Sequence, residues 1–119
     1  MSTALAADAR WRPLDEFGFD AALVAQPGIS LVMFGQPHCG ACHGWRRQLP
    51  HWLEDGIALF YVDVAVASAL ARRFELFHLP DFALYRDGAF HCMWRSAFSR
   101  AEVGRKLQAA LQAPAQEEP

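Results

Sequence analysis

Cys39 and Cys42 are the side chains of this sequence whose type and spacing best suit chemistry, because two thiols separated by two residues lie within reach of each other. They follow the apolar run at 29–34 and precede a stretch of helical periodicity, so they mark the passage from a strand to a helix. The free N–H groups and the positive dipole end of a helix stabilise an anion, which makes a thiol at this point easier to deprotonate. The pair is therefore a candidate redox site.

The number of cysteines favours a functional dithiol over a structural disulfide. The sequence has three cysteines, which cannot form a closed set of disulfides, and its first eight residues lack the basic and apolar segments of an export signal. We therefore expect a cytoplasmic protein. In the reducing cytosol the pair would rest mostly as thiols and be oxidised transiently, which favours a reductant over an oxidant.

Length, composition and charge exclude several classes of protein. The chain has 119 residues, of which 53% are hydrophobic, and this suits one globular domain with a core of its own. The net charge is −2 and the arginines are dispersed along the sequence. Without a broad cationic surface, neither a nucleic acid nor a membrane is expected as a partner.

Alternating strand and helix signals predict the elements that position the two thiols. We expect a domain over 14–112, between a flexible N-terminal segment at 1–13 and a flexible tail at 113–119. Strand and helix signals alternate before a hairpin that turns at Asp87 and Gly88, and this order predicts an α/β domain of three layers, α/β/α, around a mixed sheet. The helical signals occupy 19–25, 39–54, 67–74 and the stretch after Ser99, and the strand signals occupy 29–34, 57–64, 82–85 and 89–94.

This element order resembles that of the thioredoxin superfamily, because Cys39-Gly40-Ala41-Cys42 stands at the first strand–helix junction and Leu79-Pro80 precedes the hairpin. The resemblance covers 14–112 and implies a thioredoxin fold. It further implies that Cys39 is the attacking nucleophile, that Cys42 is the more buried resolving thiol, and that Pro80 has a cis peptide bond facing the pair. Leu79 would then present its backbone to an extended substrate. The residues implied to shape the site are His38, Gly40, Ala41, Leu79, Pro80 and Asp81.

The activity that this resemblance implies is the reduction of protein disulfides, as part of cell redox homeostasis. A protein that carries a disulfide is the expected substrate, and an unidentified reductant such as a thioredoxin reductase or glutathione would restore the dithiol. The two sulfurs store the electrons themselves, so neither an organic cofactor nor a metal is expected.

Two departures from the family pattern concern the second chemical step. Thioredoxins usually have a buried acid six residues before the first cysteine, where this sequence has Met33. They usually also have a lysine near that acid, and Leu59 occupies the best corresponding position here. If the acid normally helps to deprotonate the resolving thiol, Cys42 requires another group or water for this purpose. We therefore expect slow turnover.

Three further departures lie around the thiols. His38 replaces the usual tryptophan, and its protonated ring would stabilise a thiolate at Cys39 if it is not simply an exposed loop residue. Ala41 replaces the usual proline between the cysteines. Asp81 replaces a small hydroxyl residue, either as a charge that repels acidic substrates or as a solvated turn residue.

Other readings of the same residues remain open. The sequence from Cys39 to His43 matches the C-x-x-C-H pattern of covalent haem attachment literally, but such attachment usually implies export and a haem pocket, whereas this motif follows a buried strand in a chain without an export signal. The two thiols with His38, His43 or His91 offer zinc ligands, but no second C-x-x-C or spaced His pair completes a zinc pattern. A non-catalytic thioredoxin-fold binding or chaperone module and a glutathione-linked, glutaredoxin-like reductase are the alternative functions. Cys92 is expected to be a buried, inert thiol.

Overall fold

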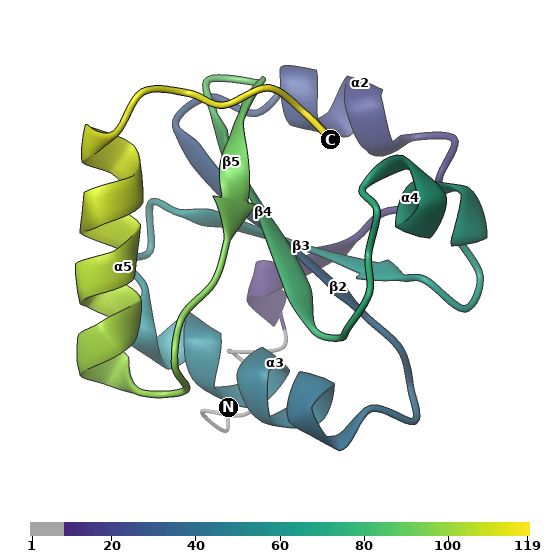
Figure 1. Cartoon of the computed structure of the whole chain (residues 1–119), viewed down its shortest axis with the longest axis horizontal. Helices are drawn as coiled ribbons and strands as arrows, with labels where there is room; N and C mark the ends of the chain where they lie inside the picture. The colour runs from purple at the N-terminus through teal and green to yellow at the C-terminus, as the bar shows by residue number, and fades with distance from the viewer. Residues whose placement is uncertain (1–8) are drawn as a thin grey trace.

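The computed structural model describes residues 9–119, which form one five-stranded sheet flanked by helices (Figure 1). The strand order is β1-β3-β2-β4-β5. β1 and β2 run parallel to β3, whereas β4 is antiparallel to both β2 and β5. The elements are β1 (Trp11–Pro13), α2 (Phe19–Val24), β2 (Ile29–Gly35), α3 (Gly40–Trp52), β3 (Ala58–Asp63), α4 (Ser68–Arg73), β4 (Asp81–Arg86), β5 (Ala89–Trp94) and α5 (Arg100–Gln112).

Two apolar clusters, one on each face of the sheet, divide the core. Trp45, Leu49, Val103 and Leu107 of α3 and α5 pack in one cluster. The helices α2 and α4 contribute to the other cluster. Alternate residues of β2 enter opposite clusters, as the period of two in a strand requires. The predicted α/β domain of three layers around a mixed sheet is thus confirmed, with small shifts at the element ends.

The N-terminal boundary of the domain differs from the prediction. Residues 1–8 lie outside the described residues, but 11–13 form β1 instead of belonging to a flexible segment. Trp11 is 5% exposed, and its Nε1–H donates to the carbonyl of Arg46 at 2.8 Å. The Arg10 guanidinium donates to four backbone carbonyls, those of Pro50, Leu53, Glu54 and Ile57, at and beyond the end of α3. A cation there satisfies orphan carbonyls and complements the helix dipole.

The C-terminal residues also make specific contacts, although the sequence predicts a loose tail from 113 to 119. The backbone N–H of Gln116 donates to the carbonyl of His91 at 2.7 Å, and Glu118 pairs with Arg73 at 2.7 Å. Figure 1 shows this segment crossing from the end of α5 over β5. The tail therefore lies along the outer strand of the sheet, although its side chains remain exposed.

Two glycines with a left-handed backbone, one before β2 and one in the turn between β4 and β5, allow a test of the local structure. Gly28 and Gly88 have φ angles of +75° and +82°, and a Cβ at Gly88 would lie 2.9 Å from the carbonyl oxygen of Val24, whereas one at Gly28 would meet nothing within 4 Å. Gly28→Ala should cost about 1–2 kcal/mol of unfolding free energy, from the left-handed backbone alone. Gly88→Ala should cost at least about 1 kcal/mol more, because the backbone of α2 must move. Equal losses in urea unfolding would contradict the contact with α2.

Candidate functional site

The strand–helix junction places Cys39 at the first turn of α3. β2 ends at Gly35, and Cys39 is the N-cap residue of α3, with its Sγ accepting the backbone N–H of Cys42 at 3.1 Å. The two cysteines form a disulfide with their Cα atoms 5.2 Å apart. Cys39 is half-buried, whereas Cys42 is 3% exposed. A substrate therefore reaches Cys39 more easily, and the helix N-terminus supplies a donor for a thiolate at this sulfur.

The Leu79–Pro80 peptide bond is cis, and both residues are half-buried. β4 begins directly after it, with Asp81 opposite Phe34 in β2. Because these two strands are antiparallel, the start of β4 and the end of β2 lie at the same end of the sheet. The cis-proline loop and the loop that leads to Cys39 therefore lie at one edge of the domain.

Asp81 is neither a solvated turn residue nor a charge exposed to substrate, so both interpretations of the sequence are wrong. It is 2% exposed, and its Oδ1 accepts the backbone N–H of Phe82 at 2.9 Å. Its Oδ2 lies 3.5 Å from Nη2 of Arg95, whose side chain is 66% exposed. A buried carboxylate requires such partners. The charge that faces solvent here is the positive one of Arg95.

The other residues predicted to shape the site are His38, Gly40 and Ala41, which are all exposed. Among the hydrogen bonds of the described residues, none joins His38 to the sulfur of Cys39, which instead accepts the Cys42 N–H. The loop is fixed by His43, whose Nε2–H donates to the carbonyl of Pro37 at 2.7 Å. Stabilisation of a thiolate by His38 stays a prediction.

The strand register defines the neighbours of Met33 in β3. Met33 is fully buried in the apolar cluster beneath α3 and α5, in the place assigned to the family's acid. The residue opposite it in β3 is Tyr61, whereas Leu59 lies opposite Leu31. Leu59 is therefore a diagonal neighbour of Met33 on the same face of the sheet, and its assignment to the family's lysine stays a prediction. Residues 59 and 61 share one face of the strand, so alternation in the sequence cannot distinguish them.

Sequence reasoning missed three residues that line a cavity of about 200 Å³ with Cys42, namely Arg46, Tyr61 and Asp63. The guanidinium carbon of Arg46 lies 4.7 Å from the centroid of the Tyr61 ring. Burial, and then the charge of Asp63, raises the pKa of Tyr61, which keeps this hydroxyl protonated at neutral pH. Two signals in the sequence point to the cavity: Arg46 follows Cys42 by one helical turn, and Asp63 ends the apolar strand beside β2.

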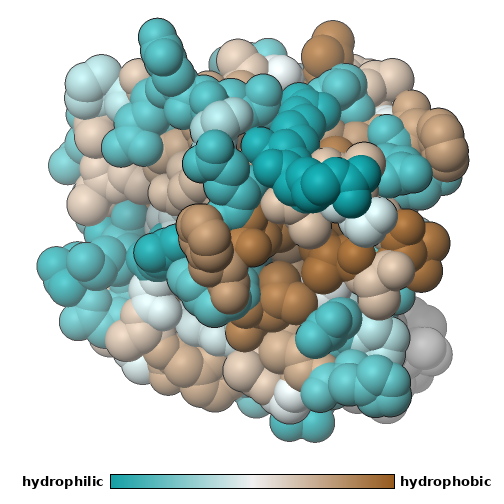
Figure 2. All heavy atoms as spheres, turned by 45° about the vertical axis from the view of Figure 1, so that its right-hand side comes forward, coloured by the Kyte–Doolittle hydropathy of each residue, from teal (hydrophilic) through white to brown (hydrophobic). Residues whose placement is uncertain are grey.

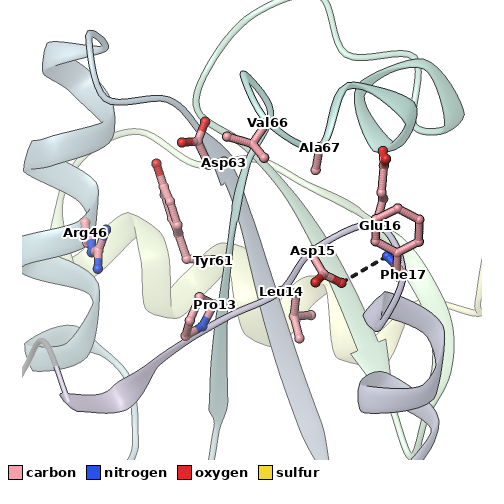
Figure 3. Close-up of a pocket in the computed structure, with 10 residues that line it drawn as sticks. All are labelled: Pro13, Leu14, Asp15, Glu16, Phe17, Arg46, Tyr61, Asp63, Val66 and Ala67. Carbon is pink, nitrogen blue, oxygen red and sulfur yellow. Dashed lines mark hydrogen bonds between the residues drawn. The ribbon is translucent and has the colours of Figure 1, made fainter.

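A larger cavity of about 630 Å³ adjoins this one and shares Arg46, Tyr61 and Asp63 as walls (Figure 3). Its remaining lining includes the segment after β1, with Asp15 and the 89% exposed Phe17. In Figure 3 the Tyr61 ring stands between Arg46 on α3 and this segment, with its hydroxyl toward Asp63. The three shared residues therefore separate the Cys42 side of the domain from the segment after β1.

Residues 9–119 contain neither a cluster of metal ligands nor a helix that could span a membrane. Their His, Cys, Asp and Glu side chains form no group of three or more that could hold a metal ion. The described helices are all too short or too polar for a transmembrane span.

The third thiol, Cys92, is free, 7% exposed and placed in β5. Burial raises the pKa of this thiol. In the reduced protein at pH 8 we expect iodoacetamide to alkylate Cys92 at least about tenfold more slowly than Cys39, because the thiolate is the reactive form. Mass spectrometry of peptides from a timed reaction measures both rates, and unfolding in urea should equalise them. Equal rates in the folded protein would contradict an inert Cys92.

Solved structures have a similar fold. Mitochondrial thioredoxin 3 from Saccharomyces cerevisiae, in its oxidised form, has a TM-score of 0.71 and 17% identity over 87% of this chain and 98% of its own. The first thioredoxin domain of mouse protein disulfide-isomerase A4 has a TM-score of 0.64 and 19% identity over 90% of this chain and 79% of its own.

The zinc-bound form of human ERp44 has a TM-score of 0.59 and 19% identity over 86% of this chain, but this corresponds to only 30% of ERp44. No protein-family model and no curated protein sequence matches the chain. The topology, the C-x-x-C disulfide at the first turn of α3 and these structural neighbours together show that the chain has the thioredoxin fold.

Proposed function

We propose that this protein is a thiol–disulfide oxidoreductase that reduces protein disulfides through a Cys39–Cys42 cycle. The observation that carries the proposal is the asymmetry of the pair: Cys39 is half-buried at the N-terminus of α3, and Cys42 is buried behind it. One sulfur is reachable by a large substrate, whereas the other is shielded from such a substrate and lies beside Cys39. This is the arrangement that an attacking and a resolving thiol require.

The cycle has two displacement steps. The Cys39 thiolate attacks one sulfur of the substrate disulfide, the S–S bond breaks, and the other substrate sulfur leaves as a thiolate that takes a proton from solvent. Cys42 then loses its proton and attacks Cys39, which forms the intramolecular disulfide and releases the second substrate sulfur. Two electrons pass to the substrate, and the protein ends in the disulfide form that the structure contains.

A separate thiol donor must supply two electrons to return the pair to its reduced form, from one dithiol or from two monothiols. A thioredoxin reductase or glutathione in the cytoplasm is the proposed source, because a pair kept reduced there acts as a donor of electrons. The exposed Arg95 beside the cis-proline loop further favours substrates with an acidic residue near their disulfide.

The reduction potential of the pair tests the proposal first. The protein is equilibrated with dithiothreitol or glutathione buffers of defined ratio, the thiols are trapped by acid, and the reduced and oxidised forms are separated by mass. A reversible two-electron couple, more reducing than the glutathione buffer of the cytosol, supports a reductant. A pair that never interconverts with its disulfide would refute the cycle and favour a non-catalytic binding module.

A further inference from the structure

The second step of the proposed cycle needs a group that removes the proton of Cys42. Cys42 is 3% exposed, and Met33, which stands opposite Tyr61 in the sheet, is apolar and fully buried. The sulfur is nevertheless not sealed, because Cys42 lines the cavity of about 200 Å³ described above. A water molecule takes up roughly 30 Å³ of liquid, so several can occupy this space beside the thiol.

The backbone of Gly35 shows how closely Cys42 and β3 approach each other. A Cβ built on Gly35 would lie 3.1 Å from Sγ of Cys42 and 3.2 Å from Cε2 of Tyr61, so both groups reach the same point. The Cα partner of Gly35 in the next strand is Asp63. The end of β3 is therefore adjacent to the buried sulfur of α3.

Four titratable or charged groups line this cavity with Cys42, and two of them are poor proton acceptors. The guanidinium of Arg46 carries N–H donors and no acceptor atom. The raised pKa of Tyr61 keeps its hydroxyl protonated. His43 is exposed, and its Nε2–H donates to the carbonyl of Pro37, which leaves Nδ1 as its only acceptor atom. Asp63 is the acceptor that stands opposite Gly35, the residue that Sγ of Cys42 approaches: its Oδ1 accepts the backbone N–H of Ala65 at 2.9 Å, and it lines the same cavity as Cys42.

We propose that Asp63 accepts the Cys42 proton through water in this cavity during the second step; this inference rests on the proposed function. The thiol proton passes to water, which gives a proton to the carboxylate of Asp63. The Cys42 thiolate attacks the Cys39 sulfur of the mixed disulfide, the bond from Cys39 to the substrate breaks, and the substrate sulfur leaves with the electron pair. Asp63 then releases its proton to solvent.

The test separates the two steps with Ellman's reagent, 5,5′-dithiobis(2-nitrobenzoate), as the disulfide. Reduced protein, carrying Cys92→Ala in every sample, releases one thionitrobenzoate when Cys39 attacks and a second when Cys42 resolves the mixed disulfide. Stopped-flow absorbance gives both rates from pH 6 to pH 10. Asp63→Asn is the test variant, because an asparagine oxygen can still accept the N–H of Ala65 while the carboxylate is lost.

Asp15→Asn is the matched control. Asp15 also lines the larger cavity, and its Oδ1 accepts two backbone N–H groups, those of Phe17 and Gly18, but it does not line the cavity of Cys42. We expect Asp63→Asn to slow the second phase about 10²-fold at pH 7 and to leave the first phase unchanged. The rate should recover at alkaline pH, where hydroxide removes the proton directly. Asp15→Asn should change neither phase.

The direction of the effect distinguishes proton transfer from a simple field effect. Removing a negative charge beside Cys42 favours its thiolate, so electrostatics alone would speed the second phase. An unchanged or faster second phase in Asp63→Asn, or an equal loss in Asp15→Asn, would overturn the role of Asp63 while leaving the cycle intact. A parent protein that releases only one thionitrobenzoate would instead refute the Cys39–Cys42 cycle itself.

Discussion

Cys39→Ser is expected to reduce the rate of disulfide reduction by at least about 10³-fold, because it removes the nucleophile of the first step. The measurement is the precipitation of insulin driven by dithiothreitol, with the rate of dithiothreitol alone subtracted. Cys39 is half-buried at the N-terminus of α3 and is the accessible sulfur of the pair. A hydroxyl at this position is too weak an acid to form the attacking anion.

Two companion variants make this result specific. Cys42→Ser leaves the first step intact, so a mixed disulfide between Cys39 and the substrate should accumulate and be visible by mass. Cys92→Ala should keep the full rate, because this thiol is 7% exposed and belongs to the apolar cluster beneath α3 and α5. Insulin reduction that survives in Cys39→Ser, or that is lost in Cys92→Ala, would place the reactive thiol elsewhere.

Trp11→Ala is expected to cost about 3–5 kcal/mol of unfolding free energy, as is typical for removing a large buried aromatic side chain. The indole is 5% exposed, packs in the cluster that includes Leu49 and Leu59, and donates to the carbonyl of Arg46. Because the whole stability of a domain is about 5–15 kcal/mol, this one change removes a large part of it. Urea unfolding followed by circular dichroism measures the loss.

Phe17→Ala is the matched control for that experiment. Phe17 lies six residues further along the same N-terminal part of the chain, but it is 89% exposed. Its removal should change the unfolding free energy by less than about 0.5 kcal/mol. If Trp11→Ala also lost less than about 1 kcal/mol, β1 would not be an integral part of the sheet.

The sequence predicts most of the fold because its buried elements are long enough to show their period. The apolar runs of β2 and β3 and the capping residue of α5, Ser99, whose Oγ accepts the N–H of Glu102, are local signals. β1 has only three residues, of which one is buried, so it shows no period by itself. It becomes a strand through its parallel pairing with β3, and the sequence does not reveal that pairing.

The residues of the candidate site could likewise be predicted where they depend on local spacing, but not where they depend on strand pairing. The positions of Cys39 and Cys42 follow from local spacing, and the cis bond at Pro80 was implied by the family resemblance. The burial of Asp81 depends on pairing with Phe34 and on Arg95, which is distant in the sequence. The grouping of Asp63 with Cys42 depends on the register between β2 and β3. Such tertiary relations override what a residue type suggests by itself.

The cavity residues change how the two family departures are understood. Met33 stands beneath α3 where the family has its acid. The pairing of β2 with β3, however, places Asp63 opposite Gly35 and in the lining of the cavity that contains Cys42. The slow turnover expected from the sequence then depends on Asp63.

The contact between the C-terminal tail and β5 has a consequence for self-association. A sheet that ends in unpaired N–H and C=O groups can pair with a second molecule, and proteins shorten, bend or cover such edges. At one margin β1 is short and ends in Pro13, which has no N–H to offer. At the other margin, the pairing of β5 with β4 skips His91 in a β-bulge, and the backbone N–H of Gln116 donates to the carbonyl of His91. Both margins are therefore partly protected against intermolecular strand pairing, and a chain that ends at Gln112 would lose the contact of Gln116 with β5.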